Sequence, residues 1–220
     1  MDNNIKRILI WSSWYRLSHV LIGLSTLLLL ATGSLIRLSP MLTAQAADIH
    51  HYSSAGFLAG LVIRFILMVK GKPHERLSYL IPTLMERRGI VAMLRFYALL
   101  GKAPLPNWYA QNPFWKPLYL LIYLLLITQL ITGIYLTNHA FLFGFQPREL
   151  HVLCSSLLLG FTLCHIFCSI WHDYASSNSD VSAIINGLRT FNVETKGQQS
   201  QSSQAVKFTP MDAAKAKRKK

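Results

Sequence analysis

The chain has 220 residues, of which 52% are hydrophobic and 14% are charged, and its mean hydropathy is +0.33. This composition argues against a soluble globular domain and indicates an integral membrane protein. The net charge of +13 would suit a nucleic-acid-binding protein, but the lysines and arginines lie outside the apolar segments, so they indicate membrane topology and no nucleic acid partner.

Four apolar segments are long enough to cross a hydrocarbon core of about 30 Å, which takes about 20 helical residues. In chain order they cover approximately 14–36, 50–69, 116–137 and 149–171. The second apolar run is short and contains Arg64, so we extend its start upstream to include His50. We therefore predict an all-α membrane protein, with four transmembrane helices forming a bundle within one membrane domain of residues 1–191.

The basic residues predict how these helices are oriented. Seven lysines and arginines lie within residues 70–115, and both ends of the chain are basic. The other two connections, 39–48 and 138–149, contain only Arg148. By the positive-inside rule, both termini and the loop 70–115 are expected in the cytoplasm.

Two segments outside the four predicted spans have sequences that predict their structure. The segment Gly89–Leu100 (GIVAMLRFYALL) predicts a short interfacial helix, with Arg95 on its polar side. Residues 192–220 are rich in Gln, Ser and Lys, which predicts a disordered, basic cytoplasmic tail in contact with anionic lipid.

The N-terminus also has the features of a cleavable secretory signal, with basic residues, an apolar stretch and the small residues Ala44 and Ala46. The apolar stretch is longer than a signal core, and cleavage would remove His19. We expect the first helix to be retained.

Three cysteines, Cys154, Cys164 and Cys168, fall on the fourth predicted helix, where thiols usually behave as small buried hydrophobic groups. They match neither the C-x-x-C-H motif of covalent haem attachment nor the spacing of an iron–sulfur cluster. Any haem in this protein would therefore be held by axial ligation alone.

Histidines within the apolar segments are the main functional signal. His151 and His165 are fourteen residues apart, so on one helix they share a face at levels about 21 Å apart. The predicted topology places His19 at the depth of His165, and places His50 and the adjacent His51 at the depth of His151. Depth does not separate His50 from His51; we choose His50, with His51 as the alternative. His74, His139 and His172 lie in loops or at helix ends, where a solvated role is expected.

Ionisable groups within a membrane are costly and mark functional sites, and imidazole is a common axial ligand of haem iron. A histidine relay in a proton or metal transporter is a rival interpretation. Such a transporter predicts carboxylates within the membrane, and no Asp or Glu falls inside the apolar runs 14–36, 53–69, 118–136 and 150–171. A purely structural anchor would leave the matched histidine depths unexplained.

Several motifs in sequence order resemble those of the cytochrome b subunits of nickel–iron hydrogenases, within the wider bacterial cytochrome b561 group. The resemblance covers about residues 11–191. It rests on Trp14–His19 (W-x-R-x-x-H), His50 with Arg64, the segments 111–113 (QNP) and 132–133 (TG), the spacing of His151 and His165, Asp173, and the segment 182–189 (SAIINGLR).

The resemblance implies a membrane protein of the bacterial inner membrane with two b haems. It would carry electrons between a periplasm-facing redox enzyme, or the iron–sulfur subunit of that enzyme, and the quinone pool. By the same resemblance, His19 and His165 would ligate the cytoplasmic-side haem, and His50 and His151 the periplasmic-side haem. Arg16 and Arg64, and less strongly Arg37, are candidate partners of haem propionates, although arginines at helix ends often only anchor in headgroups.

The wider group, which includes formate dehydrogenase cytochrome subunits, suggests a quinone near Asn112 and Lys116. The alternative is that Asn112 and Pro113 only start the third helix. Both outer connections are shorter than expected for hydrogenase cytochromes, which leaves the partner open. A formate dehydrogenase or thiosulfate reductase type complex, or a c-type cytochrome partner, is the alternative.

Overall fold

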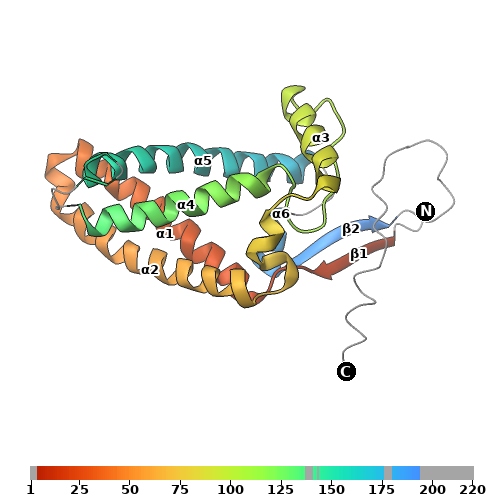
Figure 1. Cartoon of the computed structure of the whole chain (residues 1–220), viewed down its shortest axis with the longest axis horizontal. Coiled ribbons are helices and arrows are strands. Elements are labelled where there is room, and N and C mark those ends of the chain that lie inside the picture. Colours follow the sequence, from red (N-terminus) through yellow and green to blue (C-terminus); the bar gives the residue numbers. More distant parts are fainter. Residues whose placement is uncertain (1–3, 137–140, 143, 176–179, 194–220) are drawn as a thin grey trace.

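A computed structural model describes residues 4–136, 141–142, 144–175 and 180–193. Four helices in it are long and apolar enough to cross a membrane, by length and composition. They are α1 (Ser13–Leu38), α2 (Thr43–Lys70), α4 (Trp115–Ile134) and α5 (Pro147–Ala175), which lie alongside one another in a bundle (Figure 1). The predicted mostly helical membrane fold with four spans is confirmed.

The second and third helices differ from the predicted ranges. α2 begins at Thr43, seven residues before the predicted start, and α4 ends at Ile134 rather than 137. The added turns of α2 contain Ala, Gln and Asp, which lower the hydropathy but are compatible with a helix following the short 3-10 turn Pro40–Leu42. His50 therefore lies two turns inside its helix.

Small residues allow α1 and α2 to pack closely. A Cβ added at Gly56 would lie 2.8 Å from Ser25 Oγ, and one added at Gly60 would lie 2.9 Å from Ile22 Cγ1 and 3.0 Å from the backbone nitrogen of Ile22. In membranes, where apolar burial between helices gains little, such close backbone contact stabilises helix pairs. Next to these glycines on α2, Phe57 and Leu61 pack against apolar side chains of α4 and α5.

Gly60→Leu is expected to destabilise the fold because the new side chain must push α1 and α2 apart. Overpacking of this kind costs about 1–3 kcal/mol or more. Thermal denaturation of the purified protein in detergent, followed by circular dichroism, should show a lower Tm. Gly160→Leu is the matched control, because an added Cβ there meets nothing within 4 Å. Equal Tm values for the two variants would contradict the close contact.

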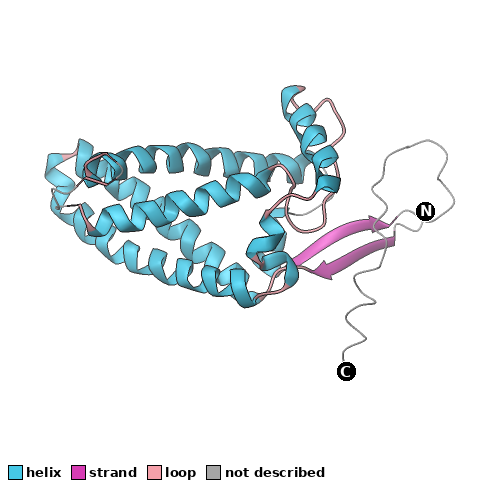
Figure 2. Cartoon of the chain, viewed as in Figure 1, coloured by secondary structure: helices cyan, strands magenta, loops and turns pink. Residues whose placement is uncertain are grey.

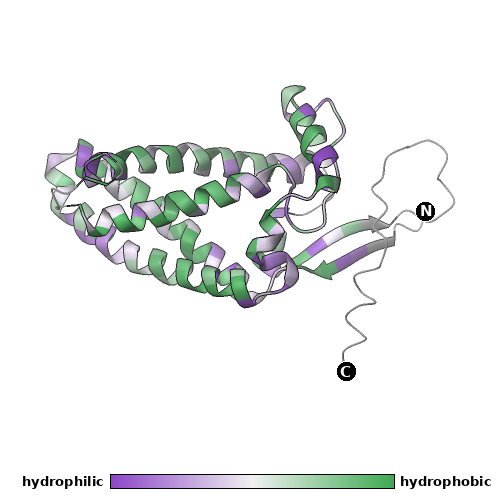
Figure 3. Ribbon diagram, in the orientation of Figure 1, coloured by the Kyte–Doolittle hydropathy of each residue, from purple (hydrophilic) through white to green (hydrophobic). Residues whose placement is uncertain are grey.

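The remaining described elements gather at one end of the bundle, which we call the basic end (Figure 2). It comprises the connection from α2 to α4, with the 3-10 turns Pro73–Glu75, Leu77–Leu80 and Leu84–Glu86 and the helix α3 (Arg87–Ala98), together with α6 (Asp180–Asn186), β1 (Asn4–Leu9) and β2 (Leu188–Val193). Hydrophilic colouring is more frequent here than along the spans (Figure 3). α3 matches the predicted helix Gly89–Leu100, with Arg95 exposed and Met93 and Phe96 buried.

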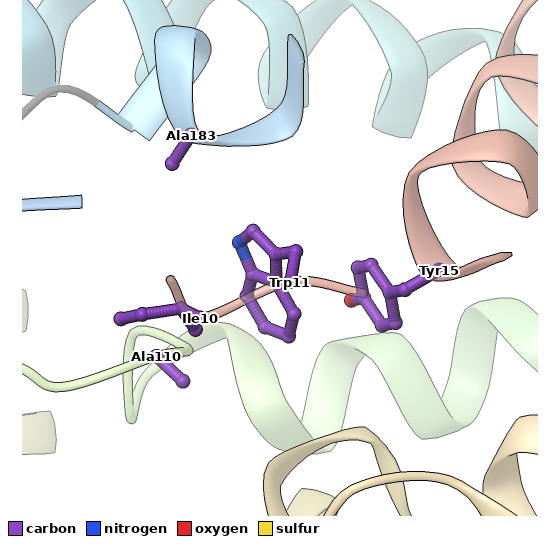
Figure 4. Packing of buried hydrophobic residues seen from close by; sticks show 5 residues of the cluster. All are labelled: Ile10, Trp11, Tyr15, Ala110 and Ala183. Atoms are coloured by element: carbon purple, nitrogen blue, oxygen red, sulfur yellow. The ribbon is translucent and has the colours of Figure 1, made fainter. Parts of the chain in front are cut away.

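The two strands form an antiparallel ribbon that was not predicted, with Lys6 opposite Phe191 and Ile8 opposite Arg189. β2 extends past the predicted domain boundary at residue 191, and residues 194–220 of the predicted tail lie outside the described residues. Beside the ribbon, a small core forms from Ile10, Trp11, Tyr15, Ala110 and Ala183, with the rings of Trp11 and Tyr15 stacked 4.1 Å apart (Figure 4).

This core ties the start of α1 to distant segments. The Ser12 hydroxyl caps α1 by accepting a hydrogen bond from the Tyr15 backbone N–H at 3.1 Å. The Ser12 backbone N–H donates to the buried carboxylate of Glu75 at 2.9 Å. The first helix, which carries His19, is therefore fixed to the loop between α2 and α4.

Candidate histidine pairs between the helices

The four histidines selected from the sequence form two pairs. The ring centres of His19 on α1 and His165 on α5 are 6.2 Å apart. Those of His50 on α2 and His151 on α5 are 6.4 Å apart. His51 is exposed, so the helical rotation brings His50, and not its neighbour, to His151.

Both separations fit two imidazoles bound to opposite sides of one metal ion. Metal–imidazole bonds of about 2 Å, plus about 1.2 Å from each nitrogen to its ring centre, give a separation of about 6.4 Å. Among the described residues, no group of three or more His, Cys, Asp or Glu side chains is arranged to hold a metal ion. Two histidines are too few for a structural zinc site, but they are sufficient for a haem, whose porphyrin supplies the remaining ligands.

Each histidine of the second pair is held by a threonine from the neighbouring helix. Thr32 Oγ1 lies 2.9 Å from His50 Nδ1, and Thr132 Oγ1 lies 3.0 Å from His151 Nδ1. Hydrogen bonding at Nδ1 leaves Nε2 of each ring available as a ligand.

Aromatic rings surround the first pair on the α4–α5 side. Phe161 stacks on His165, with ring centres 5.6 Å apart and an interplanar angle of 9°. Trp115 and Tyr119 approach His165 edge-on at 5.8 and 6.0 Å. These contacts fix the ring orientation of His165 in an apolar environment.

Comparison with known proteins agrees with this geometry. The family model described as prokaryotic cytochrome b561 matches residues 10–187. The chain belongs to the prokaryotic cytochrome b561 family. It is also 22% identical, over 86% of its length and 89% of the relative's, to a protein of Cupriavidus necator described as a probable Ni/Fe-hydrogenase B-type cytochrome subunit. No solved structure gives a significant match.

Membership of the cytochrome b561 family makes the chain a bacterial membrane b-type cytochrome that functions in electron transfer, and it implies haem b as the cofactor. The two histidine pairs fit that cofactor in ligand type and in spacing. The family resemblance that we found from the sequence motifs is therefore confirmed, because the family model covers most of the chain.

Arg64 is buried, with 2% of its surface exposed, so it does not anchor in headgroups. Its Nε donates to the Tyr123 hydroxyl at 2.7 Å, its Nη1 donates to the Glu75 carbonyl at 2.9 Å, and its guanidinium lies 4.5 Å from the ring centre of Tyr15. Its Nη2 has no hydrogen-bond acceptor among the described residues. Arg64 therefore keeps one buried donor available for an anionic group.

Arg16 is arranged similarly. Its Nη1 donates to the Ile185 carbonyl at 2.5 Å and its Nη2 to the Ser13 hydroxyl at 3.1 Å. Its Nε is buried without an acceptor among the described residues. Arg37, the third candidate, is exposed at the other end of α1.

Asn112 and Lys116, the residues selected for a quinone site, are both buried. Asn112 Oδ1 accepts from the Phe114 backbone N–H at 3.0 Å, which agrees with a role in starting α4. Its Nδ2 has no acceptor among the described residues. Lys116 Nζ lies 2.5 Å from Glu86 Oε1 and 3.7 Å from the ring centre of Tyr79. Asn112 is thus free to donate, whereas Lys116 is already paired.

The expectation of a solvated role is wrong for His172, whereas His74 is half-buried and His139 lies outside the described residues. His172 is 4% exposed and its Nε2 lies 2.8 Å from the Tyr97 hydroxyl, which also accepts from Trp115 Nε1 at 2.8 Å. Burial raises the pKa of Tyr97 above its ordinary value. His74 Nε2 bonds to the Ile10 carbonyl at 2.5 Å. The sequence placed both histidines in loops or at helix ends but gave no sign of their contacts with Tyr97 and with the Ile10 carbonyl.

The SAIINGLR segment has a structural role. Arg189, buried to 1% exposure, pairs with Asp180 at 2.9 Å and donates to the Tyr109 carbonyl at 3.0 Å. Burial raises the pKa of Asp180 to about 6, although Arg189 opposes the shift. Gly187 has φ +82°, and a Cβ there would lie 2.8 Å from the Trp11 carbonyl oxygen, so the turn requires glycine. This segment connects the start of α1 to the loop that precedes α4.

Proposed function

We propose that this chain is a dihaem b-type cytochrome of the bacterial inner membrane that transfers electrons between a periplasmic redox partner and the quinone pool. The observation that carries the proposal is the pair of bis-histidine arrangements, at 6.2 and 6.4 Å, placed about four helical turns apart along α5. The positive-inside rule supports cytoplasmic termini and a cytoplasmic basic end.

In this proposal, His19 and His165 hold the haem near the basic end, and His50 and His151 hold the outer haem. Haem b, when bound, supplies one-electron redox chemistry. The chain would supply imidazole nitrogens as ligands, an apolar environment that excludes water, and the buried N–H groups of Arg64 and Arg16 as donors to propionates. The paired ring spacing favours ligation over a histidine relay, in which neighbouring rings would be linked by hydrogen bonds.

The redox partner is proposed to be a hydrogenase-like enzyme or its iron–sulfur subunit. The support is the similarity to a protein of Cupriavidus necator described as a probable Ni/Fe-hydrogenase B-type cytochrome subunit. Co-purification of the tagged full-length chain from its native membrane tests this assignment. Recovery of a formate dehydrogenase, a thiosulfate reductase or a c-type cytochrome in its place would contradict it.

Quinone reactivity is tested by adding a reduced quinone analogue, duroquinol, to the purified oxidised protein and following the b-type absorption bands. The proposal expects reduction of the haem signal by duroquinol. A protein whose haem is reduced by dithionite but never by duroquinol would contradict the quinone role.

Asn112→Ser is expected to slow haem reduction by duroquinol about tenfold or more, the effect of losing one buried hydrogen bond to a ligand. Serine can still accept from the Phe114 backbone N–H, so the start of α4 is preserved, but the amide donor Nδ2 is removed. The dithionite-reduced spectrum of the variant serves as the control and should equal that of the wild type. An unchanged rate with duroquinol would remove Asn112 from the quinone site.

A further inference from the structure

Two Thr-Gly pairs face the outer histidines in the same way. Thr32 and Gly33 on α1 contact His50, and Thr132 and Gly133 on α4 contact His151. A Cβ added at Gly33 would lie 3.5 Å from His50 Cε1, and one added at Gly133 would lie 3.4 Å from His151 Cε1. Each ring therefore lies against a glycine with its Nδ1 at the adjacent threonine hydroxyl.

The direction of these two hydrogen bonds follows from the helix carbonyls. Thr32 Oγ1 donates to the Leu28 carbonyl at 2.6 Å, and Thr132 Oγ1 donates to the Thr128 carbonyl at 2.8 Å. A hydroxyl has a single proton, and a carbonyl oxygen can only accept. Because the hydroxyl proton of each threonine points to its own helix, the lone pairs of the oxygen are left facing the imidazole. Both histidines are therefore donors at Nδ1, with the threonine oxygens as acceptors.

We propose that Thr32 and Thr132 are positioning residues that hold His50 and His151 as Nδ1–H tautomers and direct both Nε2 atoms to one iron. This inference rests on the proposed dihaem function. A histidine protonated at Nδ1 has its free lone pair at Nε2, the nitrogen needed for ligation. The tautomers of His50 and His151 are thus selected by α1 and α4, which do not carry the ligands of the outer haem.

The threonine oxygen that accepts from Nδ1–H also affects the reduction potential of the iron. An acceptor at Nδ1–H makes the imidazole a stronger donor to the metal, which favours the oxidised state. Removing it should therefore raise the reduction potential of the outer haem. The haem at His19 and His165 is an internal reference, because Thr32 is thirteen residues, or about 20 Å, further along α1 than His19.

The test compares Thr32→Val, Thr132→Val and the double variant by redox titration of each haem and by electron paramagnetic resonance of the oxidised protein. Both single variants should shift the potential of the outer haem upward, and the double variant should shift it further. Retention of that haem should weaken about 10–100-fold. Thr128→Val is the matched control on α4, because its hydroxyl bonds only to the Leu124 carbonyl among the contacts described.

Thr132→Ser keeps the hydroxyl and should restore wild-type behaviour if Thr132→Val loses the outer haem altogether. Unchanged potentials and resonance spectra in the double variant, with both haems bound, would overturn the role of the threonines. Equal loss of haem in Thr132→Val and Thr132→Ser would also overturn it. A wild-type protein without an outer haem would instead refute the dihaem function, so the two failures are distinguishable.

Discussion

His151→Ala is expected to lose one haem and retain the other, so that the purified variant holds about half the haem of the wild type. His50→Ala should give the same result, because both rings belong to the pair separated by 6.4 Å. His19→Ala and His165→Ala should each remove the other haem. The remaining haem in the two classes of variant should differ in reduction potential.

His51→Ala is the matched control for these variants, since it removes an imidazole one position from His50 on an exposed part of α2. It should retain both haems. Haem content is measured by absorption of the pyridine complex against protein concentration. Loss of a haem in His51→Ala with retention in His50→Ala would reverse the ligand assignment.

Arg64→Met is expected to destabilise the fold and to lower the reduction potential of the haem near His19. The variant leaves the Tyr123 hydroxyl and the Glu75 carbonyl without their buried donor, at a cost of about 1–3 kcal/mol for each group. Loss of a nearby positive charge disfavours the reduced state, and a change of about 1.4 kcal/mol corresponds to about 59 mV for one electron.

Two further variants, Arg64→Lys and Arg37→Met, distinguish the effect of the Arg64 charge on the reduction potential from the effect of its packing on the Tm. Arg64→Lys keeps the charge but cannot make the same bonds, so it should lower the Tm with a smaller change in potential. Arg37 is exposed, and Arg37→Met should change neither quantity. Redox titration and thermal denaturation are the measurements. An unaltered potential in Arg64→Met would exclude an electrostatic role toward the haem.

The histidine pairing was predictable from the sequence because it depends on depth, and depth follows from helix rise and the positive-inside rule. The choice between His50 and His51 was not predictable from depth. Adjacent helical residues differ in direction by about 100°, and the packing of the bundle decides which of the two faces inward. The roles of Thr32 and Thr132 were also not predicted. Each lies within an apolar helix, and only the neighbouring helix shows what its hydroxyl contacts.

The basic end was least predictable. The strand β1 contains Lys6 and Arg7, which read as topology signals, and it forms only because β2 pairs with it from the other end of the chain. The burial of His172 depends on α3, which comes from a segment far away in the sequence. The local sequence pattern predicted α3 itself. Hydrophobic periodicity predicts secondary structure but does not predict which distant segments contact one another.

Whether the two histidine pairs each hold one haem b is tested by the haem content and the electron paramagnetic resonance spectrum of the purified wild-type chain. We predict about two haems per chain, both low-spin with two imidazole ligands. One haem per chain, no haem, or a high-spin signal with a single imidazole ligand would contradict this account.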